Sequence, residues 1–138
     1  MQKITIKEKE YFYDEQEIIN FNEGLIGLPE MRRAVLIPLP ECEPFFWLAS
    51  VDDEKNRFVV VNPHEVFENY KAPAPGEFAA AADAQESKTL AIVKVSSDWK
   101  KTTVNLRAPM FIDGKNKRGA QCVLTESNYD LAETLPQI

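Results

Sequence analysis

The stretch Thr102-Thr-Val-Asn-Leu-Arg-Ala-Pro-Met-Phe-Ile-Asp-Gly-Lys-Asn-Lys-Arg-Gly-Ala-Gln-Cys-Val-Leu124 contains three short apolar runs separated by turn-forming residues. Asp113-Gly114 follows the second run, and Asp-Gly between two strand-like runs is a strong hairpin signal, because glycine tolerates the positive φ of such turns. Pro109 has no N–H to donate, which places it at a strand start or on an edge. The stretch therefore predicts three consecutive strands, at Thr102–Leu106, Met110–Ile112 and Ala120–Leu124. The last two are expected to form an antiparallel hairpin.

The rest of the chain also consists of short apolar or alternating runs between polar, glycine and proline residues. Residues 2–13 are expected to form a first hairpin, Pro63 to start a single helical turn, and the alanine-rich residues 77–84 to form a helix. Many short strands with short connections predict an all-β, compact, mostly antiparallel fold with one short helical insertion, built as two packed sheets or a small barrel. Further strands are expected at 34–37, 45–51, 58–61 and 90–95.

Length and composition are those of one globular domain spanning residues 1–138, with residues 126–138 forming a loosely held tail. Of the 138 residues, 44% are hydrophobic and 28% charged, as is common in soluble domains. No apolar run is long enough to span a bilayer, and the first residues lack the apolar core of a secretion signal. A cytoplasmic location is expected.

The charge is uneven along the chain. The formal net charge is −6, and residues 1–70 carry −7 of it against +1 for the remainder. An acidic protein repels a phosphate backbone, so direct nucleic-acid binding is disfavoured, whereas association with a basic partner is accelerated. The alternative is that the charge serves solubility alone.

No residue pattern points to catalysis, a metal or a cofactor. His64 is the single histidine, and it directly follows Asn62-Pro63, where a surface or capping role is common. Cys42 and Cys122 are too far apart in the sequence to suggest a zinc site. The residues alone therefore predict a binding module, not an enzyme, with no metal and no cofactor.

Four sequence motifs occur in order along nearly the whole chain. They are Ile19-x-Phe21-x-x-Gly24-Leu25-x-Gly27, Pro44-Phe45-Phe46 with Leu48-x-Ser50-x-Asp52, Phe58-x-Val60-x-Asn62-Pro63, and Thr103-x-Asn105-Leu106-x-Ala108-Pro109 with Arg118-Gly119, Gln121 and Val123-Leu124. Together they resemble the bacterial flagellar assembly factors of the FliW family, and the resemblance favours a compact barrel-like β fold. One departure is that Tyr129 is followed by Asp130-Leu-Ala-Glu-Thr-Leu-Pro136 with no arginine, whereas the family usually has a basic residue there.

The resemblance implies two competing protein partners, flagellin and the RNA-binding translational regulator CsrA. Sequestered CsrA cannot repress flagellin synthesis, and accumulated flagellin would release it again. Alternatives are a flagellin chaperone without a translational role, or a small-ligand-binding β domain with a pocket near His64. The candidate partner-binding residues are the acidic Glu15, Glu17, Asp52, Asp53 and Glu54, with Asn62, Trp99 and Asn105, of which both asparagines could instead be structural.

Overall fold

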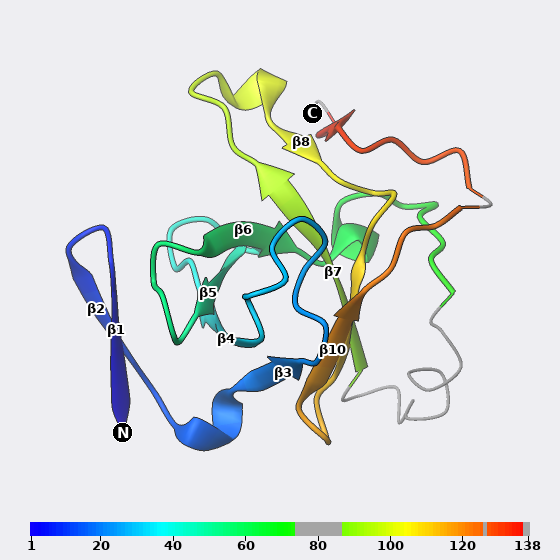
Figure 1. The fold of residues 1–138 in the computed structure, drawn as a ribbon. Helices are drawn as coiled ribbons and strands as arrows, with labels where there is room; N and C mark the ends of the chain where they lie inside the picture. Colours follow the sequence, from blue (N-terminus) through cyan, green and yellow to red (C-terminus); the bar gives the residue numbers. More distant parts are fainter. Residues whose placement is uncertain (74–86, 126, 137–138) are drawn as a thin grey trace.

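A closed seven-stranded β-barrel forms the body of the molecule (Figure 1). The computed structural model describes residues 1–73, 87–125 and 127–136. Neighbouring barrel strands are antiparallel except for β3 and β10, whose parallel pairing helps to close the ring. The prediction of an all-β, mostly antiparallel fold is confirmed, and the choice left open is settled as a barrel. In order around the ring, the strands are β3 (Ile19–Phe21), β4 (Arg33–Pro38), β5 (Phe46–Ser50), β6 (Arg57–Val61), β7 (Ser87–Lys94), β9 (Met110–Asp113) and β10 (Arg118–Gln121).

Strand β7 pairs with two strands along the same edge. Its first half, Ser87–Leu90, pairs with β9, and its last residues pair with β8 (Thr103–Val104). The far edge of β8 in turn pairs with β11 (Glu133–Thr134). The strand predicted at Thr102–Leu106 is therefore shorter than expected, because the chain must leave the ladder between β8 and β9.

The predicted hairpin at residues 2–13 is confirmed and forms a second, two-stranded sheet. Strands β1 (Gln2–Ile6) and β2 (Lys9–Tyr13) pair from Gln2 opposite Tyr13 to Ile6 opposite Lys9. Their buried side chains pack on the outer face of β4 and β5. This outer cluster contains Ile4, Ile6, Tyr13, Val35, Ile37 and Ala49.

The barrel interior is filled by alternate residues of its strands. On β4, Ala34 and Leu36 belong to the inner cluster, whereas Val35 and Ile37 belong to the cluster under the hairpin. On β5, Leu48 faces the interior and Ala49 the hairpin, which agrees with the predicted strand covered on both faces. A third cluster covers the outer side of β6 and β7 beneath residues that reach it from the segment after η2 and from the C-terminal segment.

Three single 3₁₀ turns are the helical elements of the described residues. They are η1 (Glu15–Glu17), η2 (Pro63–Glu65) and η3 (Trp99–Lys101). The turn predicted to start at Pro63 is thereby confirmed. The helix predicted at residues 77–84 lies outside the described residues.

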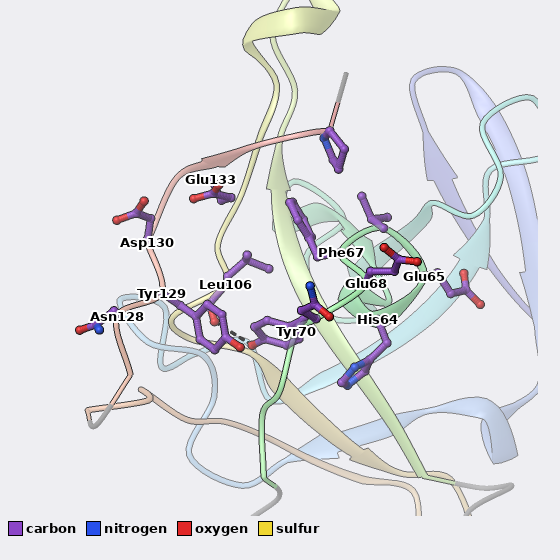
Figure 2. A pocket seen from close by; sticks show the side chains of 13 residues that line it. His64, Glu65, Phe67, Glu68, Tyr70, Leu106, Asn128, Tyr129, Asp130 and Glu133 are labelled. Atoms are coloured by element: carbon purple, nitrogen blue, oxygen red, sulfur yellow. Dashed lines mark hydrogen bonds between the residues drawn. The ribbon is translucent and has the colours of Figure 1, made fainter. Parts of the chain in front are cut away.

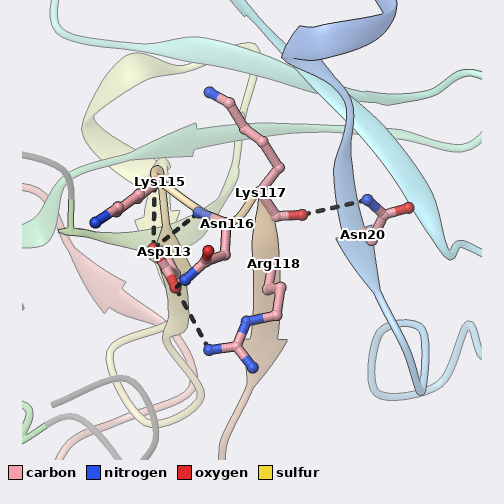
Figure 3. Close-up of polar contacts among 6 residues, drawn as sticks. All are labelled: Asn20, Asp113, Lys115, Asn116, Lys117 and Arg118. Carbon is pink, nitrogen blue, oxygen red and sulfur yellow. Dashed lines mark hydrogen bonds and ion pairs between the residues drawn. The ribbon is translucent and has the colours of Figure 1, made fainter. Parts of the chain in front are cut away.

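A buried carboxylate organises the tip of the β9–β10 hairpin (Figure 3). Asp113 is 1% exposed, and it accepts hydrogen bonds from the backbone N–H groups of Lys115 (3.1 Å) and Asn116 (3.2 Å) and from the Asn116 amide (2.8 Å). The Asn116 side chain contributes most to holding the pKa of Asp113 below its ordinary value. Arg118 adds an ion pair at 3.4 Å.

The predicted hairpin is thus confirmed, but its second strand is wrong in position. It begins at Arg118, opposite Asp113, and ends at Gln121, instead of spanning Ala120–Leu124. Because Arg118 pairs with the buried Asp113, Gln121 lies opposite Met110, the first residue of β9. The pairing of β10 with β9 therefore ends at Gln121.

Gly119 has a packing role in β10 and is not part of a turn. A Cβ at this position would lie 2.5 Å from Cε1 of Phe21 and 3.0 Å from Cδ1 of Ile112. Such distances are shorter than van der Waals contact, so only glycine allows β3 to approach β10 this closely.

We expect Gly119→Ala to destabilise the protein by about 1–3 kcal/mol, because the added methyl group overpacks the core against the Phe21 ring. Chemical denaturation measures the free energy of unfolding. Phe21→Leu would remove the ring that the methyl group strikes. The double variant should therefore lose less unfolding free energy than the sum of the losses of the two single variants. Fully additive losses would contradict this explanation.

Candidate protein-interaction site

An open groove of about 640 Å³ lies between the η2 turn and the C-terminal segment (Figure 2). Glu65, Glu68 and His64 lie along one side, and Asp130 and Glu133 along the other. Aromatic and aliphatic side chains lie between the two sides, and these are Phe67, Tyr70, Leu106 and Tyr129.

The first wall is built by a capped turn. The Asn62 side chain accepts a hydrogen bond from the His64 N–H at 3.0 Å, and Pro63 occupies the first helical position. The N–H of Phe67 donates to the Pro63 carbonyl at 2.8 Å, and the N–H of Tyr70 donates to that of Phe67 at 3.2 Å. These consecutive turns bring Tyr70 back onto the barrel.

Tyr70 anchors the floor of the groove. It is 5% exposed, and its hydroxyl donates to the Leu106 carbonyl at 2.7 Å. Burial, and secondarily Tyr129, raises the pKa of Tyr70 above its ordinary value, so the hydroxyl remains a donor. The rings of Tyr70 and Tyr129 are tilted, with their centroids 4.7 Å apart.

The second wall is the segment beyond Leu124, for which the sequence predicts loose attachment. The Tyr129 hydroxyl accepts from the Lys71 N–H at 2.8 Å, and the Leu106 N–H donates to the Asp130 carbonyl at 3.0 Å. Leu135, which follows β11, is 7% exposed within the outer core cluster. These contacts and the pairing of β11 with β8 hold the segment on the barrel.

The groove combines an apolar floor with acidic sides. Glu65, Glu68 and Asp130 are exposed, whereas Glu133 is half-buried. Burial raises the pKa of Glu133, and a hydrogen bond with Asp130 and the negative charge of Asp130 add to this effect. No lysine or arginine is among the residues lining the described groove.

The acidic residues predicted to contact a partner lie in two places. Glu17 lies beside Pro38 and Phe46 at one end of β4. Asp52 lies at the other end, with its Oδ2 atom 3.9 Å from Nε of Arg33. All five are exposed, and they are Glu15, Glu17, Asp52, Asp53 and Glu54.

Several of these carboxylates also hold the fold. Glu17 accepts from the Asp14 N–H at 2.9 Å, and Glu54 accepts from the Thr5 N–H at 3.0 Å, linking the β5–β6 turn to the N-terminal hairpin. Asp53 accepts from the Lys55 N–H at 3.1 Å.

Both candidate asparagines stabilise turns. Asn62 caps η2, and Asn105 accepts from the N–H groups of Arg107 (3.2 Å) and Ala108 (3.1 Å) where the chain passes from β8 to β9. Trp99 is 52% exposed in η3, and its ring meets that of Phe45 edge to face at 5.6 Å. Its exposed aromatic surface agrees with the sequence prediction. Trp99 is far along the chain from the candidate acidic residues at the two ends of β4.

His64, near which the sequence left open a pocket, lines the groove, but the other groove residues were missed because no local pattern connects them. Tyr70 and Tyr129 come from segments far apart in the chain, which meet because Tyr70 and Asp130 both hydrogen-bond to the backbone of Leu106. The one available signal was the acidic character of the residues after Tyr129, in place of the basic residue expected there.

Comparisons with known proteins agree on one family. Residues 4–135 match the sequence model described as FliW protein. The chain is 33% identical over 126 residues to the flagellar assembly factor FliW of Clostridium botulinum (strain Alaska E43 / Type E3), covering 89% of each chain. It is 35% identical over 118 residues to that of Bacillus subtilis (strain 168), covering 83% of this chain and 82% of that protein. A crystal structure of the flagellar assembly factor FliW superposes with a TM-score of 0.87 at 28% identity, covering 99% of both chains.

We expect Asn105→Ala to lower the free energy of unfolding by about 1–2 kcal/mol, because two backbone N–H groups lose their acceptor. Asn105→Asp keeps an acceptor oxygen and is the matched control. Urea denaturation compares the two variants with the wild type. Equal stability of all three would show that the turn does not depend on this side chain.

Glu133→Gln should raise stability at neutral pH. Because the folded-state pKa of Glu133 is raised, folding favours its protonated form, and ionisation above that pKa disfavours the folded state. The neutral glutamine lacks this penalty. The stability difference between the variant and the wild type should grow as pH rises from the unfolded-state pKa of about 4.3 through the folded-state pKa. Below the unfolded-state pKa the difference should vanish. Thermal melting from pH 3 to 8 measures it, and parallel wild-type and variant profiles would contradict it. In an Asp130→Asn background, the advantage should shrink.

Proposed function

The chain belongs to the FliW family of flagellar assembly factors, and we propose that it works by binding two protein partners in turn. One partner is CsrA, whose repression of flagellin synthesis is relieved when CsrA is sequestered. The other is flagellin, which displaces CsrA as it accumulates. The family match over residues 4–135 is the observation that carries this proposal.

The physical basis of the proposal is competition between binding equilibria, with no chemical step. Two ligands that exclude each other on one protein respond to concentration by mass action. The exposed carboxylates of the first half suit CsrA in particular, because a surface that binds RNA must carry positive charge.

We place this activity in the cytoplasm, where flagellin is translated. No helix among the described residues is both apolar enough and long enough to cross a membrane.

The proposal is tested by titrating the purified protein with CsrA and with flagellin from the same bacterium. Calorimetry should show that each binds and that each is displaced by the other. Binding of flagellin alone would favour a chaperone without a translational role. If neither binds, the partner switch is refuted and a small ligand of the groove beside His64 becomes the alternative.

Charge reversal tests the role of the acidic surface, with the rate of association with CsrA measured by stopped-flow mixing at several salt concentrations. Glu15→Lys and Asp52→Lys are suitable because neither carboxylate holds a backbone N–H in the described residues. Each should slow association with CsrA and flatten its dependence on salt. Glu30→Lys, at another exposed position, is the control for net charge. Unchanged rates in the first two variants would remove these residues from the contact.

A further inference from the structure

We propose that the groove between residues 64–70 and 128–133 binds a lysine or arginine side chain, with an apolar neighbour, from a segment of a partner protein. The inference rests on the proposed function, since it assigns a docking point to a protein whose task is to bind other proteins. It concerns a different surface from the acidic residues at the two ends of β4.

The floor of the groove fits the apolar part of such a segment. Phe67 and Tyr129 are half-buried, and the Tyr129 ring, packed against the buried Tyr70, presents ring surface between the walls. The hydroxyl of Tyr70 already donates to Leu106, and that of Tyr129 already accepts from Lys71. The floor therefore offers mainly carbon surface, against which the methylene stem of lysine or arginine, or a neighbouring leucine, can pack.

The two walls fit the charged end. Carboxylates lie on both sides of the aromatic floor, with Glu65 and Glu68 on η2 and the residues after it, and Asp130 and Glu133 on the C-terminal segment. No lysine or arginine among the lining residues neutralises them. A guanidinium or ammonium group above the rings would be attracted by carboxylates on either side and by the ring faces.

Two other occupants are less well matched. A metal ion is disfavoured because no group of three or more His, Cys, Asp or Glu side chains in the described part of the chain is arranged to hold one. A second copy of this chain could offer the exposed Lys115 and Lys117 at the β9–β10 tip. That tip, however, has no large apolar side chain beside its lysines to occupy the aromatic floor.

The test uses the full chain and two synthetic peptides, acetyl-Ser-Leu-Arg-Leu-Lys-Ser-amide and its analogue with glutamine in place of both basic residues. Amide chemical shifts in ¹⁵N-labelled protein locate the binding site and give the dissociation constant. The basic peptide should shift resonances of residues 64–70 and 128–133, and the glutamine analogue should bind at least several-fold more weakly.

The matched variants are Glu68→Gln/Asp130→Asn, which removes one carboxylate from each wall, and Glu23→Gln/Glu30→Gln, which removes the same charge from exposed sites elsewhere. The first should weaken the basic peptide about tenfold and the second should not. Melting temperatures and spectral dispersion confirm that both variants fold.

Three results would overturn the proposal: no binding of the basic peptide at millimolar concentration, equal binding of both peptides, or shifts confined to another surface. Concentration-dependent shifts in the groove without peptide, abolished by Lys115→Gln/Lys117→Gln, would instead identify a second copy as occupant.

Titrating Glu68→Gln/Asp130→Asn with CsrA and flagellin separates this inference from the proposed function. If the peptide fails while both proteins bind normally, only the groove assignment falls; if the peptide binds while neither protein binds to the wild type, only the partner switch falls.

Discussion

The division of one edge of β7 between β8 and β9 is the constraint on which the rest of the structure depends. Because Ser87–Leu90 pair with β9, the barrel closes, and because Val93 and Lys94 pair with β8, a second ladder continues beyond the ring. The chain can serve both strands only if it leaves the sheet between them and returns. Asn105 makes that departure possible by accepting two backbone N–H groups that would otherwise lack a strand partner.

The groove is a consequence of the same division. Since β8 lies outside the closed ring, its free edge is available to β11, which carries the C-terminal segment back across the barrel. The departure after β8 also presents the backbone of Leu106, which accepts from Tyr70 on one side and donates to Asp130 on the other. The backbone of a single residue thus joins both walls, and it holds them at a fixed place beside β8.

Features that depend on local chemistry could be predicted from the sequence, whereas those that depend on distant pairing could not. Alternating Ile4 and Ile6 predicted the first hairpin, and Asp113-Gly114 predicted the second, because a turn and its flanking strands are neighbours in sequence. Closure requires β3 to meet β10, nearly a hundred residues later, and periodicity carries no information about that contact. The same limit hid the groove. It also misplaced the second strand of the hairpin, whose register depends on how Asp113 is buried.

The availability of a carboxylate to a partner is decided by its hydrogen bonds, and a count of charges does not reveal it. Glu17 and Glu54 are exposed and acidic, yet each accepts a backbone N–H that maintains a turn or attaches the N-terminal hairpin. A partner that bound such a carboxylate would have to break its hydrogen bond to the backbone N–H. That cost reduces the net binding free energy of the contact. The exposed carboxylates of Glu68 and Asp130 lie beside an aromatic floor whose two tyrosine hydroxyls already hydrogen-bond to the backbone. A cationic side chain entering there would gain attraction without displacing an interaction that maintains the barrel.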